Sequence, residues 1–161
     1  LVWGGAALSW RSPIPIRDPY SGERQAMDAE ALEVLLAERA CERLVLDYAA
    51  YNDAADWEAL AALYVPEGRM SRPTAPDQFI EGQAAILAAF RARPPRRTRH
   101  VCANIRVTLQ GSDTAHISSQ ILLFTAADQS PLVGSFADIC VKTDAGWRFA
   151  ERRGSLDFPS A

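Results

Sequence analysis

The chain has 161 residues, of which 48% are hydrophobic and 23% are charged, and its formal net charge is -3. This length and composition predict one globular domain with a core of its own, and they exclude a fibrous or disordered chain. The negative net charge argues against a nucleic-acid partner, and the sequence holds no run of about 18 apolar residues that could span a membrane.

The first 26 residues contain no methionine, and a helical pattern begins directly after Met27. They hold apolar residues and prolines but no basic segment followed by an apolar core, so they do not match a signal peptide. Two interpretations stay open for residues 1–26. They are either a vector-derived or alternative-start leader, or an arm that packs over a partner or a pocket mouth. Residues 27–161 are expected to form the domain.

A long amphipathic helix is predicted from Asp28 to Asn52, because apolar residues recur there at steps of three and four. The segment "NDAAD" then supplies a stop and a restart. Asp53 or Asp56 can cap a second, short helix over residues 57–64, which Pro66 ends.

The next segment is predicted to contain a short strand, 67–73, and a loop, 74–78, which is inferred from its composition alone. A third helix is expected over 83–93, where a pair of prolines ends it. The run "RARPPRRTR", 91–99, is the one basic cluster of the sequence. It is interpreted either as a solvated loop between elements or as a handle for an anionic substrate.

Four strand-like runs rich in β-branched residues follow, over 98–110, 114–126, 131–144 and 146–158. The short joints "GSD" and "DAG" indicate antiparallel hairpins. Three helices followed by such a meander predict an α+β fold, and a strongly curled sheet leaves an apolar cleft against the helices. Because the strands carry apolar residues on both alternations, a homodimer or homotrimer through the outer face of the sheet is expected.

The three cysteines, Cys41, Cys102 and Cys140, are widely spaced and match no zinc or redox motif. They are expected to be small apolar residues in a reducing compartment, which predicts a cytoplasmic location. Neither a metal nor a cofactor is expected, because the sequence has no ligand cluster and no glycine-rich phosphate loop. Any catalysis is therefore predicted to be cofactor-independent proton transfer.

Only two histidines occur. His116 follows a turn and is expected to be partly exposed, whereas His100 begins a strand, where a backbone carbonyl commonly satisfies a histidine. Asp53 supports another interpretation of His100, because a carboxylate beside an apolar helix face needs a partner and an imidazole N–H is a suitable one. An aspartate that orients an imidazole makes it a competent general base, but Asp53 can equally be a helix cap.

Three runs, "YAAYNDAADWEALAALY", "TRHVCANIRV" and "DAGWRFAERRGSLDF", resemble the SnoaL-like branch of the nuclear transport factor 2-like superfamily. The resemblance covers about residues 28–158. It rests on a helix ending in D-x-x-D-W-x-x-L, a strand beginning near T-x-H, and a last strand entered through a Gly-Trp turn. It implies a cone-shaped, curved antiparallel (mixed) sheet, closed by three helices around a hydrophobic pocket. Activity varies within the branch, and some members are not catalytic.

Dehydratases and dehydrochlorinases of this branch pair an aspartate at the end of the first helix with a histidine on the sheet. The resemblance therefore implies that His100 is the base, that Asp53 orients it, and that Tyr48 donates a hydrogen bond to a substrate oxygen. On an ideal helix Tyr48 lies about 140° around from Asp53, so both face the pocket only if the helix bends or ends there. Arg72 and Thr125 stand where scytalone dehydratase has a tyrosine and a histidine, so its leaving-group contacts are not reproduced.

Tyr51, Trp57 and Phe136 are predicted as apolar walls of the pocket, although each can equally be plain core. Asp138, on the same strand as Phe136, is a candidate second polar group in the cavity. The predicted function is a cofactor-independent lyase or isomerase that removes a proton from an apolar cyclic small molecule. The alternative is a non-catalytic module that binds a ligand or assembles with a larger enzyme, as the small subunit of an oxygenase does.

Overall fold

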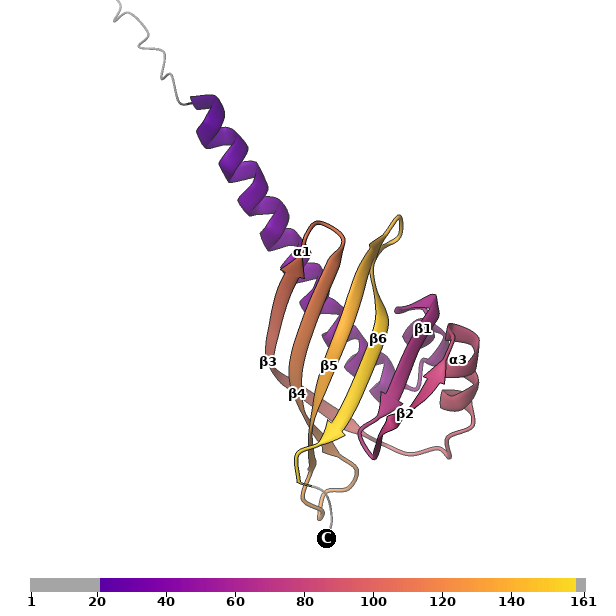
Figure 1. The fold of residues 1–161 in the computed structure, drawn as a ribbon. Coiled ribbons are helices and arrows are strands. Elements are labelled where there is room, and N and C mark those ends of the chain that lie inside the picture. Colours follow the sequence, from indigo (N-terminus) through magenta and orange to yellow (C-terminus); the bar gives the residue numbers. More distant parts are fainter. Residues whose placement is uncertain (1–20, 159–161) are drawn as a thin grey trace, which may run out of the picture.

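The structure is a computed structural model that describes residues 21–158, with side chains from residue 28 (Figure 1). The interpretation of residues 1–26 as a leader or arm therefore falls outside the described residues, except for its last six positions. These positions belong to the first helix, which begins at Ser21 and not at Asp28. The helical pattern thus continues on both sides of Met27.

Three helices and six strands make up the described chain: α1 (Ser21–Ala54), α2 (Trp57–Ala61), β1 (Tyr64–Arg72), β2 (Ala75–Glu81), α3 (Gln83–Arg91), β3 (Arg99–Gln110), β4 (Thr114–Phe124), β5 (Leu132–Thr143) and β6 (Gly146–Leu156). The strand order is β2-β1-β6-β5-β4-β3. All neighbours are antiparallel except β1 and β6, which are parallel. The predicted α+β class with a mixed sheet is confirmed.

Two further predictions about the elements were wrong. The second helix ends at Ala61, because Tyr64 already pairs with Phe149 of β6 and so begins β1. Most of the predicted loop 74–78 belongs to β2, which pairs with β1 through Met70 and Ile80. Pairing with a neighbouring strand thus overrides the turn-forming composition of this segment.

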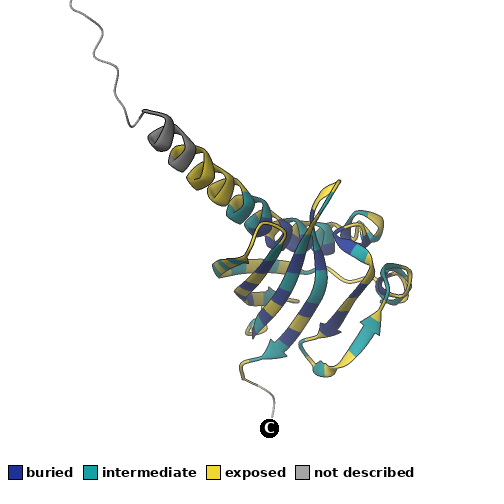
Figure 2. Cartoon of the chain, turned by 45° about the horizontal axis from the view of Figure 1, so that its top comes forward, coloured by how far each residue is buried: buried dark blue, intermediate teal, exposed yellow. Residues whose placement is uncertain are grey.

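The second half of α1 crosses one face of the sheet, and the core lies between them (Figures 1 and 2). Buried members of this core include Val45, Leu60, Ile86, Phe90 and Phe149. The first part of α1 extends beyond the sheet, and its leucines there are exposed. No helix within the described residues is long and apolar enough to cross a membrane.

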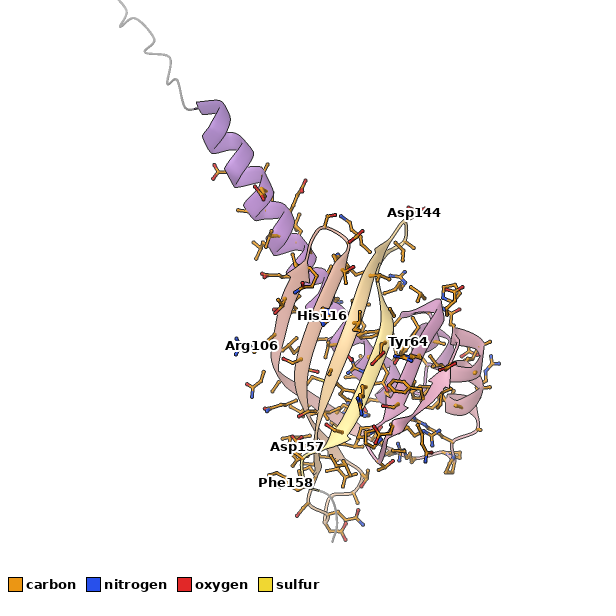
Figure 3. The ribbon with its side chains drawn as sticks, viewed as in Figure 1. Tyr64, Arg106, His116, Asp144, Asp157 and Phe158 are labelled. Atoms are coloured by element: carbon orange, nitrogen blue, oxygen red, sulfur yellow. The ribbon has the colours of Figure 1, made fainter. Side chains whose placement is uncertain are left out.

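The opposite, outer face of the sheet is more polar, and His116 of β4 is exposed on it, as predicted (Figure 3). Three apolar side chains, Val101, Leu122 and Phe124, are also exposed on this face. Self-association through the outer face stays a prediction.

Candidate active site

The site begins where α1 ends. Ala55 adopts a left-handed conformation with φ of 56°, and its N–H donates to the Asn52 carbonyl at 3.2 Å. The N–H of Asp56 donates to the Tyr51 carbonyl at 2.9 Å. This pair of bonds is a Schellman motif, which stops the helix one residue after Asp53. Asp56 then caps α2 by accepting from Ala59 N at 3.1 Å, so Asp53 is not the cap.

The Asp53 carboxylate faces the first residues of β3. Its Oδ1 accepts from Thr98 Oγ1 at 2.9 Å and lies 2.5 Å from His100 Nδ1, and its Oδ2 accepts from the His100 backbone N–H at 2.8 Å. The side chains of Asp53 and His100 are only 7% and 6% exposed. One carboxylate thus holds both the backbone and the ring of His100, and the imidazole cannot turn without losing its contact with Asp53.

A bulge in β3 turns His100 toward the inner face of the sheet. Further along the strand Ile105, Val107 and Leu109 pack against the core, and strict alternation from them would place His100 on the outer face. The pairing of β3 with β4 shifts register between Ala103 and Arg106, and Asn104 has φ of 51°. The inserted residue changes the parity of the strand, which lets His100 and the core residues share one face.

His100 lines a cavity of about 280 Å³ between the sheet and the end of α1. Tyr48 and Asn52, one helical turn apart on α1, line the same cavity. Its remaining described walls are mostly apolar and come from β1, β4, β5 and β6: Met70, Ile121, Leu123, Leu132, Phe136 and Leu156. Within the described residues, no three His, Cys, Asp or Glu side chains form a group suited to a metal ion.

The surroundings of His100 favour the neutral form of its imidazole. Burial lowers its pKa, and the positive charges of Arg96 and Arg152 act in the same direction, while the hydrogen bond and charge of Asp53 oppose them. Because Asp53 accepts at Nδ1, the neutral ring carries its proton there and has its lone pair on Nε2. No described residue bonds to Nε2, which leaves this nitrogen for a molecule in the cavity.

Tyr48 lies between the cavity and a buried ion pair that the sequence did not indicate. The Arg152 guanidinium lies 4.3 Å from the centre of the Tyr48 ring and 3.9 Å from that of Phe136. Arg152 Nη1 donates to Asp138 Oδ2 at 2.6 Å, and both side chains are fully buried. Burial raises the pKa of Tyr48, so the phenol keeps its proton.

Among the predicted site residues, the structure places His100, Tyr48 and Phe136 on the cavity and Asp53 directly behind His100. α1 ends one residue after Asp53, as the prediction allowed, yet Asp53 faces Thr98 and His100 and does not line the cavity. Asp138 does not line the cavity but pairs with Arg152, and burial raises its pKa to about 7.

Two predicted wall residues lie elsewhere. Tyr51 faces a shallow groove between α1 and α2, because Tyr48 and Asn52 occupy the side of α1 that faces the cavity. Trp57 stacks on Phe90 with ring centres 5.5 Å apart, so it joins α2 to α3. Both therefore pack beside the core, as the alternative interpretation had it.

Three arginines line the cavity at its mouth. Arg72 is at the end of β1, and Arg93 and Arg96 belong to the segment between α3 and β3.

The turn between β1 and β2 packs closely against β6 at Gly154. A Cβ atom at this position would come within 2.8 Å of Pro73, so the absence of a side chain allows the close approach.

The family model of the SnoaL-like domain matches residues 33–153 of the chain. The chain belongs to this family. Among solved structures, the SnoaL-like domain is similar to a protein of Novosphingobium aromaticivorans named "Putative Scytalone Dehydratase", with 26% identity, a TM-score of 0.70, and coverage of 81% of this chain and 93% of the other. An NTF2-like protein with a cystatin-like fold from the same organism is 25% identical, with a TM-score of 0.74 and coverage of 91% and 94%.

A hexachlorocyclohexane dehydrochlorinase, LinA type 2, shares the fold with a TM-score of 0.71 at 18% identity, over 81% of this chain and 93% of the other. The cone-shaped sheet closed by helices, which the sequence resemblance implied, is confirmed by these neighbours. A search of curated proteins finds no match for the chain.

Sequence reasoning missed Asn52, Thr98 and Arg152. Thr98 had a usable signal, because it stands two residues before His100, directly before β3, and side chains two residues apart in an extended chain lie on the same side. Asn52 also had one, since it stands four residues after Tyr48 on the same helix face. Arg152 had none, because a bulge in β6 decides which way it points.

Proposed function

We propose that this SnoaL-like domain is a cofactor-independent lyase or isomerase that begins its reaction by removing a proton from carbon. The observation that carries the proposal is the 2.5 Å contact between Asp53 Oδ1 and His100 Nδ1 beside a cavity that the same histidine lines. A geometrically fixed imidazole with a free Nε2 is the arrangement that general-base catalysis requires. The 26% identical structure named "Putative Scytalone Dehydratase" supports the lyase side of the proposal.

In the proposed reaction, His100 Nε2 takes a proton from an activated C–H bond of the substrate. Asp53 holds the imidazole in the correct tautomer and stabilises the imidazolium that forms. Tyr48 donates a hydrogen bond to the carbonyl or leaving oxygen, and the Arg152 cation against its ring favours the negative charge that develops there. The electron pair of the C–H bond then expels the leaving group or moves a double bond.

The size of the cavity bounds the substrate. A volume of about 280 Å³ is roughly twice the 150 Å³ that accommodates one benzene molecule in an engineered apolar cavity. A molecule of one or two rings fits this space, and a steroid-sized molecule would need the mouth as well. The apolar walls of β4 and β5 suit such rings.

The test compares His100→Ala and His100→Gln with His116→Ala, a control on the outer face of the sheet. Solvent deuterium uptake at activated C–H bonds is measured by NMR for a panel of cyclic ketones that carry a β-hydroxyl or β-halide group. We expect exchange or elimination with the wild type and His116→Ala, and a loss of about 10²–10⁴-fold in both His100 variants.

Full activity in folded His100 variants would reject the base. Binding of the panel without exchange or elimination by the wild type would favour the non-catalytic module instead.

A further inference from the structure

The mouth of the cavity concentrates positive charge on a protein that is acidic as a whole. Its described lining contains Arg72, Arg93 and Arg96 but no aspartate or glutamate, although the formal net charge of the chain is -3. The positive charge at this opening is therefore a local feature and does not reflect the net charge of the chain. Low-dielectric walls around one sign of charge focus the field and attract a ligand of the opposite sign.

These arginines are also free of carboxylate partners among the described side chains. Arg91 and Arg153, by contrast, pair with Glu58 and Asp77. Arg93 stacks on Phe90, with its guanidinium 3.8 Å from the ring centre, so its position is set by packing and its N–H groups stay available. Arg72 makes one long contact, from Nη2 to the Ala89 carbonyl at 3.5 Å.

The basic cluster 91–99 thus separates into different roles. Arg91 and Arg99 turn toward Glu58 and Asp53. Only Arg93 and Arg96 reach the cavity, where Arg72 joins them from a different element. The interpretation of this cluster as a solvated loop therefore does not account for Arg93 and Arg96, which line the cavity.

We propose that the substrate of this site is amphiphilic, with an apolar ring in the cavity and a carboxylate or phosphate group held at the mouth by Arg72, Arg93 and Arg96. Guanidinium groups suit both anions, because their planar forks bind two oxygens at once. The anion anchors the molecule at one end, and the ring then extends toward Tyr48 and His100. Binding of such a molecule does not depend on the proposed function. Only its conversion after binding rests on the proposed proton abstraction.

Calorimetric binding of four probes tests the inference without any turnover. The probes are 2-naphthoate, 2-naphthyl phosphate and the neutral 2-naphthamide and 2-naphthol, each at low and at high salt. We expect the anions to bind about tenfold or more tightly than the neutral probes, which is the factor for one charge-assisted hydrogen bond. The difference should shrink at high salt. The tighter of the two anions identifies the carboxylate or the phosphate as the group recognised.

The variants Arg93→Gln and Arg96→Gln should each weaken binding of the preferred anion and leave 2-naphthamide unchanged. Arg97→Gln is the matched control, since Arg97 is exposed in the same segment and does not line the cavity. Arg96 is itself exposed, so its variant tests the inference even if Arg93→Gln does not fold.

Equal affinity for naphthoate and naphthamide would overturn the inference, as would a preference for anions that survives both substitutions. Either result leaves the proposed proton abstraction untouched, because that proposal is judged by the His100 variants. Loss of activity in those variants with intact naphthoate binding would separate the two roles.

Discussion

At the scale of single residues, the protonation state of His100 decides whether it can act as a base. Burial and the charges of Arg96 and Arg152 lower its pKa below the ordinary value of about 6.5, despite the neighbouring Asp53. The imidazole is therefore neutral and basic at neutral pH, and activity should fall only as the pH drops through this lowered pKa. A histidine with an aspartate partner in water would show the opposite shift.

Arg96→Gln tests this account, because it removes one of the charges that lower the pKa of His100. We expect the pKa of His100 to rise, so that the acid limb of kcat/KM moves to higher pH. An NMR titration of the imidazole signals measures the same change without a substrate. An unchanged His100 titration would show that Arg96 does not act on the imidazole.

At the scale of elements, two irregular strands orient the site. The bulge at Asn104 brings His100 to the inner face of β3, and the register shift in β6 between Phe149 and Glu151 does the same for Arg152. Strict alternation from Trp147 and Phe149 would place Arg152 on the outer face. Bulges near a cavity commonly re-aim a side chain in this way.

Substitution of Asn104 tests whether the bulge holds His100. Asn104→Val places a β-branched residue at φ of 51° and should destabilise the protein by about 1–2 kcal/mol and reduce activity. Asn104→Gly is the matched control: it also loses the contact with Gln120, at 2.5 Å, but accepts the left-handed conformation. Urea unfolding measures the difference, and equal stability of the two variants would contradict the backbone argument.

These bulges also show how far the sequence could predict the site. The helical spacing of α1 and the strand pattern of β3 to β6 come from local periodicity, which the sequence displays directly. The proximity of Asp53 and His100 followed from a family resemblance, since nothing local joins residues so far apart. The basic cluster 91–99 was visible in the sequence as a candidate anion handle, but its meeting with Arg72 depends on the packing of two segments. The direction of Arg152 depends on a bulge in β6, and neither feature leaves a periodic signal.

At the scale of the whole molecule, one charged pair lies where most proteins place apolar side chains. Asp138 and Arg152 join β5 to β6 with no exposed side-chain surface, and Asp138 Oδ1 and two Arg152 nitrogens have no described partner. Burying an incompletely satisfied pair contributes little to folding compared with well-packed apolar residues. Arg152 lies against the Tyr48 ring, where its positive charge would stabilise the negative charge of the proposed reaction. This contact gives a reason to retain the buried pair.

Asp138→Ala should lower the free energy of unfolding by about 3–5 kcal/mol, because it leaves the Arg152 charge buried and unpaired. Asp77→Ala breaks the exposed pair with Arg153 and should change stability much less. The double variant Asp138→Leu/Arg152→Met removes both charges, so most of the lost stability should return while activity does not. Urea unfolding measures the stability of each variant, and the deuterium exchange assay measures its activity. If the double variant were as unstable as Asp138→Ala, the pair would be a structural requirement of the sheet and not a cost carried for the site.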